Sequence, residues 1–246
     1  MILVKSPEEI EIMREGGAIL AEMLETVKKE VRAGVTTGEL DDLVVVEMRR
    51  RGVVASFKGY QGYPASACIS INDEVVHGIP GARVIREGDI VSVDLGVFCK
   101  GFHTDAAFTV GVGKVTPRAA QLMDVTREAL REGVKYARVG NHVGDVSAAI
   151  QRYVESAGLS VVREYTGHGV GRNLHEDPQI PNFVYGGKGA VLRPGMTLAI
   201  EPMVTAGGWR TRVTDNGWTV VTLDGSLSAH FENSVAVTDG EPIVFA

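Results

Sequence analysis

The sequence predicts an α+β fold built from two similar halves, and three observations support this prediction. Apolar residues recur at steps of three and four in several segments, which is typical of amphipathic helices. Other segments alternate apolar and polar residues, as half-buried strands do. A helix-opening segment is also duplicated, because residues 32–40 align without gaps to residues 138–146 and the same offset carries Gly52 onto Gly158. This repeat indicates a duplicated unit.

We expect residues 1–246 to form a single domain, with halves of about 1–112 and 113–246. No stretch between the halves is rich in proline or serine, so no linker is indicated. The length is sufficient for a full hydrophobic core. Two similar halves related by a pseudo-twofold axis would leave a cleft between them.

The first half begins with two predicted helices. Ser6-Pro7-Glu8-Glu9 forms a capping box with proline at the first helical position, and it starts a helix that Gly34 ends. Thr36-Thr37-Gly38-Glu39 is a second capping box, whose helix runs to Arg51 and stops at Gly52. Strands are expected over residues 53–58, 67–72 and 91–110.

The second half repeats this order. An amphipathic helix pattern runs from Pro117 to Tyr136, and the duplicated segment then opens another helix that stops at Gly158. We expect the glycine-rich residues 178–193 to be a mobile loop. Strands are expected near Val161 and over residues 196–204, 218–222 and 229–237.

Composition excludes several classes of protein. The net charge of −6 gives no basic footprint, so nucleic-acid binding is not indicated. No run of about 18 apolar residues is present, which argues against a membrane protein. Cys68 and Cys99 are too few for a disulfide scaffold. Because no targeting segment is visible either, we expect a cytoplasmic protein.

The hairpin expected over residues 91–110 carries two aspartates in an apolar setting. A two-residue turn at Lys100-Gly101 would pair residue 96 with residue 105. Asp94 and Asp105 would then share one face, with Cβ atoms about 7 Å apart. Two carboxylates this close repel each other unless a positive charge lies between them. A metal is the simplest candidate, and a solvated polar strand face is the alternative.

Three further polar residues lie in apolar or glycine-rich surroundings in the second half, namely Glu201, Glu232 and His168. A glutamate within a hydrophobic strand is costly to bury unless it is paired or bound to a cation. Each residue alone has a plain alternative, as an ion-paired glutamate or a loop histidine. Together with Asp94 and Asp105 they provide five donors, more than one zinc ion needs, and so predict a two-metal site.

The donor set predicts both the metals and the reaction. Oxygen-dominated donors favour Mn, Fe(II) or Co, with Zn as an alternative. Two divalent metal ions lower the pKa of water enough for attack at neutral pH, and they polarise a carbonyl group. The predicted chemistry is hydrolysis of an amide or an ester.

The ligand set and several motifs resemble the type I methionine aminopeptidases. The motifs are Asn72-Asp-Glu-Val-Val-His77-Gly-Ile-Pro80, Gly167-His168-Gly-Val-Gly171, Leu174-His175-Glu-Asp-Pro178 and Ala199-Ile-Glu201-Pro-Met203. The resemblance spans essentially the whole chain, in order and spacing as well as in residue type. It implies the duplicated "pita-bread" fold and the removal of N-terminal methionine from nascent polypeptides.

The resemblance implies a role for each ligand. Asp94 and Asp105 would hold one metal. Asp105 and Glu232 would bridge it to the second metal, and His168 and Glu201 would complete that second site. Glu201 would also carry a proton from the attacking water to the departing amine.

The resemblance also implies substrate contacts. His77 would contact the substrate near the scissile amide, and His175 would donate to the carbonyl oxygen as it becomes tetrahedral. Without the resemblance, a neutral core or surface role is an equal alternative for both. The methionine pocket, an apolar space suited to a thioether, would be lined by Tyr60, Tyr63, Cys68 and Trp218. Ordinary core packing is the alternative for these four residues.

Three positions depart from the family's pattern. Leu174 stands where some members carry phenylalanine, so we expect a wider or differently shaped pocket. His230 and Asn233 flank Glu232 and replace residues that are often Gln and His in relatives. These changes leave open the hydrogen bonding around the ligands and the metal preference.

Two alternative functions stay open on the sequence alone. A Xaa-Pro aminopeptidase or prolidase shares the fold, but such relatives usually carry an extra N-terminal domain, which we do not expect here because the first helix starts at residue 7. A non-catalytic binding protein on the same fold would be expected to have lost ligands, whereas all five are present. We expect a monomer that acts on the N-termini of nascent polypeptides, and ribosome contact would be compatible with that role.

Overall fold

A nine-stranded antiparallel sheet forms the centre of the structure, a computed structural model that describes residues 1–246. Its strands follow the order β1-β4-β5-β14-β9-β7-β8, with β2 also paired to β4 and β15 to β14. Two three-stranded sheets, β13-β10-β6 and β11-β12-β3, complete the strands. The strand bounds are β1 Val54–Ala55, β2 Ala67–Ile71, β3 Glu74–Val76, β4 Ile90–Cys99, β5 Phe102–Gly111, β6 Ser160–Val161, β7 Thr166–Gly169, β8 Glu176–Pro181, β9 Thr197–Ile200, β10 Met203–Thr205, β11 Thr211–Val213, β12 Val220–Thr222, β13 Ser228–His230, β14 Glu232–Ala236 and β15 Ile243–Val244.

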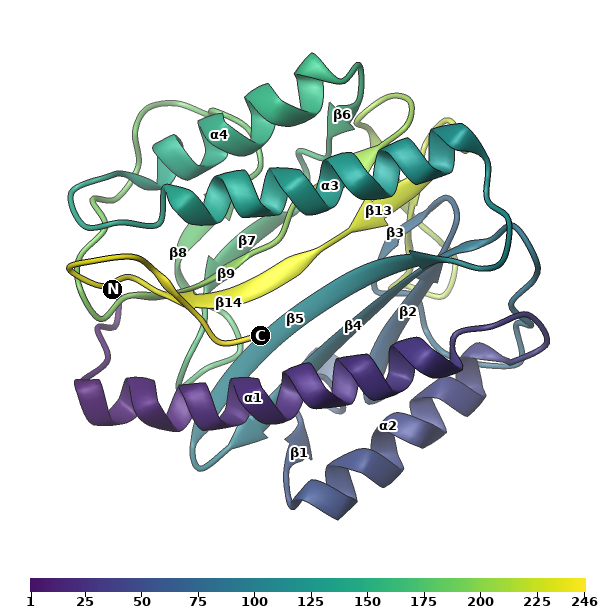
Figure 1. The fold of residues 1–246 in the computed structure, drawn as a ribbon, viewed down its shortest axis with the longest axis horizontal. Helices are drawn as coiled ribbons and strands as arrows, with labels where there is room; N and C mark the ends of the chain where they lie inside the picture. The colour runs from purple at the N-terminus through teal and green to yellow at the C-terminus, as the bar shows by residue number, and fades with distance from the viewer.

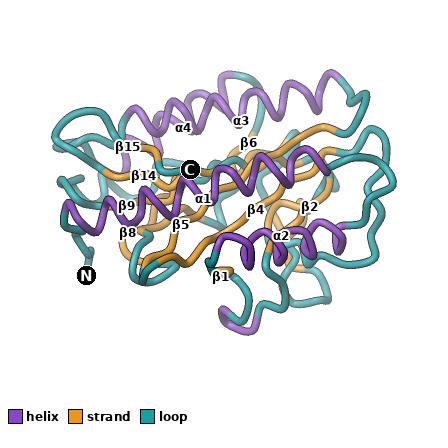
Figure 2. The backbone as a smooth tube through the Cα atoms, turned by 60° about the horizontal axis from the view of Figure 1, so that its bottom comes forward, coloured by secondary structure: helices purple, strands orange, loops and turns teal.

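Four α-helices pack on the large sheet in two pairs. The helices are α1 Pro7–Glu30, α2 Thr37–Arg51, α3 Pro117–Lys135 and α4 Val143–Ser156, and a short 3-10 helix covers Tyr60–Gly62. Helix α1 packs on β4 and β5, whereas α3 packs on α4 and α4 reaches β8. Figure 1 shows β5 and β14 running between the pair α1–α2 and the pair α3–α4, and Figure 2 shows α3 and α4 along the upper side of the molecule.

The predicted helix starts are confirmed, because each capping box forms. The Ser6 hydroxyl accepts from the Glu9 N–H while the Glu9 carboxylate accepts from the Ser6 N–H. Thr36 and Glu39 make the same reciprocal pair. Helix α2 ends at Gly52, whose φ of 68° is left-handed and therefore favours glycine.

The duplicated segments adopt the same backbone in both halves. Gly34 and Gly140 have φ of 90° and 86° at equivalent positions. The Asp145 carboxylate accepts from the His142 N–H at 2.7 Å and so starts α4 as Glu39 starts α2. These parallels support a duplication, and the division into two halves stays a prediction.

The register predicted for the central hairpin is confirmed. Gly96 pairs with Asp105 and Asp94 pairs with Ala107 along β4 and β5. Lys100 and Gly101, with φ of 48° and 92°, form the two-residue turn between the strands. This turn fixes the two aspartates diagonally across one face of the sheet.

Several strand predictions were wrong in extent. The expected strand over 196–204 is two strands, β9 and β10, because Pro202 has no N–H to donate and breaks the ladder. The expected strand over 229–237 divides at Phe231, where the chain passes from the small sheet of β13 to the large sheet of β14. Within 53–58, only β1 is a strand.

The expectation of a loop over 178–193 was wrong at its start. Strand β8 extends to Pro181 and pairs with β7, with Gly167 opposite Ile180. Prolines at 178 and 181 mask the strand in the sequence, since proline is unusual within a sheet. Strands β3, β7, β11 and β15 were not predicted, because they are too short to show an alternation of period two.

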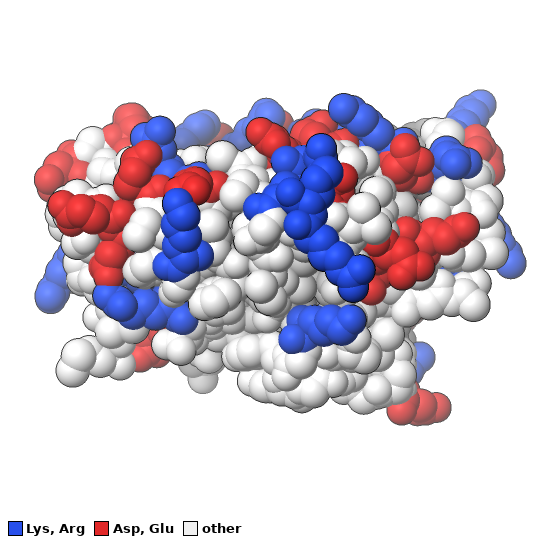
Figure 3. Space-filling view, turned by 90° about the horizontal axis from the view of Figure 1, so that it is seen from below, with Lys and Arg blue, Asp and Glu red and all other residues white.

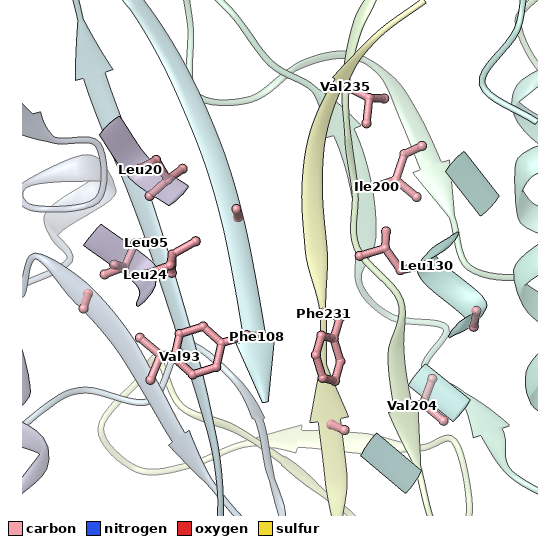
Figure 4. Packing of buried hydrophobic residues seen from close by; sticks show 14 of the residues in the cluster. Leu20, Leu24, Val93, Leu95, Phe108, Leu130, Ile200, Val204, Phe231 and Val235 are labelled. Atoms are coloured by element: carbon pink, nitrogen blue, oxygen red, sulfur yellow. The ribbon is translucent and has the colours of Figure 1, made fainter. Parts of the chain in front are cut away.

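One hydrophobic core fills the space between the helices and the large sheet. Leu20 of α1 packs there with Val93 and Leu95 of β4, and Ile200 and Leu130 extend the same cluster on the α3 side (Figure 4). Because side chains alternate along a strand, the side chain of the one residue between Val93 and Leu95 points away from the helices. Asp94 therefore lies on the opposite face of the sheet.

The outer surface carries charges of both signs. On the face shown in Figure 3, lysine and arginine are interspersed with aspartate and glutamate along the upper edge, and the lower part is largely uncharged. None of the helices combines the length and apolarity that a bilayer span would need.

A buried ion pair fastens residues 1–6 to the start of β8. The Lys5 ammonium group contacts the Glu176 carboxylate, and the two side chains are only 1% and 2% exposed. The Glu176 carboxylate also accepts from the Asn173 N–H. Removal of one partner from a buried ion pair is strongly destabilising, because the other charge is then buried and unpaired.

We expect Lys5→Ala to lower the free energy of unfolding by about 3–5 kcal/mol, because it leaves the Glu176 carboxylate buried and unpaired. Urea unfolding of both proteins measures this difference. Lys100→Ala is the matched control, since Lys100 pairs with Glu15 on the exposed surface. Equal losses of unfolding free energy in the two variants would contradict the prediction that the buried pair matters more for stability than the exposed pair.

Candidate metal centre

All eleven residues predicted for the site line one pocket of about 160 Å³. The predicted residues there are Asp94, Asp105, His168, Glu201, Glu232, His77, His175, Tyr60, Tyr63, Cys68 and Trp218. Leu174, expected to alter the pocket shape, also lines it. Phe57 and Gln61 complete the lining and were not predicted. Their closeness in sequence to Tyr60 was the only available signal.

Neighbouring strands each supply one donor. In spatial order, β4 carries Asp94, β5 carries Asp105, β14 carries Glu232, β9 ends just before Glu201, and β7 carries His168. The pairing of Glu232 with Ala107, and of His168 with Ala199, sets the donors in register. The sheet therefore gathers residues that lie far apart in the sequence.

The donors leave buried oxygens without hydrogen-bond partners. These atoms are Oδ1 of Asp94, Oδ1 of Asp105 and Oε1 of Glu232. A buried polar atom without a partner is costly, and native structures hold few of them. Asp105, His168 and Glu232 also place one donor atom each within 4.8 Å of one another. The residues present therefore fit a divalent cation.

Burial sets the protonation states of the carboxyl groups. Desolvation raises the pKa of Asp94 to about 7 and that of Glu201 to about 8. Desolvation, reinforced by neighbouring carboxylates, raises the pKa values of Asp105 and Glu232 well above the usual range. The four carboxyl groups are therefore more stable when they hold protons or metal cations than when all four carry an unpaired negative charge.

The imidazole of His168 is held in a form that can bind a cation. Desolvation lowers its pKa to about 3, so the ring is neutral. The Gly169 carbonyl accepts from Nδ1 at 2.8 Å, which leaves the lone pair on Nε2. Nε2 lies 3.5 Å from Oε1 of Glu201.

Two more histidines border the pocket. His175 lies at the exposed rim, with Nδ1 2.7 Å from the Tyr60 hydroxyl and its ring 4.2 Å from that of His168. His77 has a left-handed φ of 59° and packs edge-on against Trp218. A non-glycine residue in this conformation is uncommon and often marks a functional position.

One wall of the pocket is apolar. Phe57, Tyr63, Cys68 and Leu174 pack together there, and Trp218 lies against Tyr63 at a ring distance of 5.1 Å. The Tyr63 hydroxyl lies 3.0 Å from the carbonyl oxygens of both Ala67 and Gly78, so the backbone takes up its one proton. Aromatic and sulfur neighbours suit an unbranched apolar side chain.

Comparisons with known proteins agree with this geometry. The family model described as metallopeptidase family M24 matches residues 11–239. A methionine aminopeptidase of Clostridium perfringens is 50% identical, over 98% of this chain and 97% of that protein. Methionine aminopeptidase 1 of Bacillus subtilis is 48% identical, over 97% of this chain and 96% of that protein.

Solved structures are similar to this chain over its whole length. A methionine aminopeptidase from Thermotoga maritima has a TM-score of 0.97 and 48% identity, covering 100% of this chain and 99% of that chain. A Xaa-Pro dipeptidase from Bacillus anthracis has a TM-score of 0.78 and 24% identity, covering 99% of this chain but 61% of that chain. The second likeness concerns the fold alone.

We expect divalent metal binding to release protons from the pocket. Metals bind carboxylates, whereas the raised pKa values of Asp94 and Glu201 keep part of these groups protonated near pH 7. Calorimetric titration of the metal-free protein with Mn²⁺, in buffers of different ionisation enthalpy, measures the proton count. Release should be larger at pH 6.5 than at pH 9, and uptake or no exchange at pH 6.5 would contradict the expectation.

Proposed function

The chain belongs to metallopeptidase family M24 and, within it, to the methionine aminopeptidases, and we propose that it removes N-terminal methionine from nascent proteins. Family membership makes it a hydrolase of the metallo-exopeptidase class that uses a divalent metal. The convergence of five donors from neighbouring strands beside an apolar pocket carries the proposal.

We assign the metal ligands as the family resemblance implies. Asp94 and Asp105 would hold one ion, with Asp105 and Glu232 bridging to a second. His168 and Glu201 would complete the second position. When bound, two divalent ions of Co, Mn, Fe(II) or Zn supply Lewis acidity toward the scissile carbonyl and activate water for attack at neutral pH. The unpartnered buried oxygens support this assignment.

Glu201 is the proposed proton carrier. Its carboxylate takes a proton from the attacking water and delivers it to the departing amine. In the metal-free pocket, burial raises the pKa of this carboxyl group to about 8, so its affinity for a proton is unusually high for a glutamate. Its Oε1 lies 3.5 Å from Nε2 of His168, another of the proposed ligands.

His175 is the proposed donor to the carbonyl oxygen. If the Tyr60 hydroxyl donates to Nδ1, the Nε2–H of His175 is free to donate to the oxygen as the carbon becomes tetrahedral. His77 would contact the substrate near the scissile amide. Tyr60, Tyr63, Cys68 and Trp218 would hold the methionine side chain and exclude water.

The comparisons favour this function over a Xaa-Pro peptidase. The relatives at 46–50% identity over nearly the whole chain are methionine aminopeptidases. The Xaa-Pro dipeptidase shares 24% identity and has additional chain outside the match. A cytoplasmic location, a monomeric state and ribosome contact stay predictions.

Asp105→Ala should abolish metal binding and hydrolysis of a Met-Ala-Ser peptide together, because Asp105 is the proposed bridge. The unchanged enzyme should cleave Met-Ala-Ser far faster than a Xaa-Pro peptide under the same conditions. Peptide hydrolysis and metal analysis provide the readouts. Asp124→Ala, on the exposed surface of α3, is the matched control. Full activity of Asp105→Ala, or a preference for Xaa-Pro, would refute the proposal.

His175→Ala should lower kcat by about 10²–10³, the usual effect of removing one donor to a developing oxyanion. Tyr60→Phe should lower kcat less and leave metal affinity unchanged, because Tyr60 acts through His175. Steady-state kinetics of the two variants and of the double variant measure this. Additive losses in the double variant would show that the two residues act independently.

A further inference from the structure

A sixth buried donor, His230, lies next to the proposed metal ligands. It ends β13, one residue before the chain crosses to β14, and it is only 1% exposed. Its Nε2 has no hydrogen-bond partner. The imidazole is not among the residues that line the substrate pocket. Neither the proposed reaction nor the core packing accounts for this atom.

Distances around His230 suit a shared cation better than hydrogen bonds. Nε2 lies 3.6 Å from Oε2 of Glu201 and 3.9 Å from Oε2 of Glu232. Hydrogen bonds between N–H and oxygen are about 2.7–3.2 Å long. Two donor atoms that each bind one ion at about 2.1 Å lie roughly 3–3.6 Å apart, close to the distance to Glu201.

The backbone of His230 is fixed, so its side chain cannot move far from the carboxylates. Its N–H donates to Oγ1 of Thr109 at 2.9 Å, and its carbonyl accepts from the same hydroxyl at 2.7 Å. His230 also pairs with Met203 across β10 and β13. These contacts join β5 of the large sheet to the small sheet and set the direction of the imidazole.

Two donor clusters share Glu232. One contains Asp105, His168 and Glu232, and the other contains Glu201, His230 and Glu232. The two oxygens of Glu201 face different imidazoles, since Oε1 lies near His168 and Oε2 near His230. The Glu201 carboxylate therefore lies between two imidazoles.

We propose that His230 is a nitrogen ligand of the metal centre, binding through Nε2 an ion that Glu201 and Glu232 also hold. On the ligand assignment proposed above, this is the second ion, which His168 also holds. This inference rests on the proposed two-metal site and deepens it. Imidazole binds Co and Zn more strongly than Mn, so His230 favours the former pair of metals.

X-ray absorption of the full-length protein loaded with two equivalents of Co²⁺ tests the proposal without any substitution. We expect one histidine per cobalt on average. One histidine for every two cobalt ions would overturn the proposal, because His168 alone would then be bound. Cleavage of Met-Ala-Ser by the same sample tests the proposed function separately, so active protein with half a histidine per ion refutes only the His230 assignment.

His230→Gln gives a second test. Titration with Co²⁺ should show that one binding step weakens by about tenfold or more, with a change in the visible absorption of cobalt, while the ratio of Co²⁺ to Mn²⁺ affinity falls. His142→Gln removes a partly exposed imidazole at the start of α4 and should leave both steps unchanged. An unchanged affinity and spectrum in folded His230→Gln would overturn the proposal.

Discussion

Mutual repulsion among carboxylates that have lost their water is the constraint on which the site depends. Asp94, Asp105, Glu201 and Glu232 share one space, and burial raises the pKa of each. Such a group of acids is stable only when it holds protons or cations. Interactions elsewhere in the fold must therefore keep the four carboxyl groups close together. Those interactions are the strand ladders that carry the donors, and the rigidity of the ladders gives the acids no room to separate.

The two faces of the sheet divide stability from chemistry. Val93 and Leu95 contribute to the core beneath α1, while Asp94, the residue between them, faces the pocket. Because strand alternation makes this division automatic, a change on the apolar face acts mainly on stability and a change on the polar face acts mainly on the site. The buried pair of Lys5 and Glu176 is an exception, because Glu176 directly follows His175 in the chain. A change in this pair would therefore affect both stability and the site.

Short-range rules in the sequence were enough for much of this structure. The turn at Lys100-Gly101 determined the register of the central hairpin, and the capping boxes determined where helices begin, because each rule depends on neighbouring residues only. Strand β8 and the break at Phe231 depend on which sheet edge is free, which is a long-range property. The position of Phe57 in the pocket and the direction of His230 toward Glu201 depend on side-chain packing between distant strands, so no local pattern reveals them.

The spacing of the donors along the chain has a consequence for metal supply. Residues from Asp94 to Glu232 meet only after the strands pair, so an unfolded polypeptide offers no preformed chelate. An ion that binds the native state alone adds to its stability by mass action, by about 2.7 kcal/mol at a free concentration one hundred times Kd. Scarcity of the ion in the cell would therefore reduce the amount of intact polypeptide as well as its turnover of substrate, since the unfolded fraction is open to degradation.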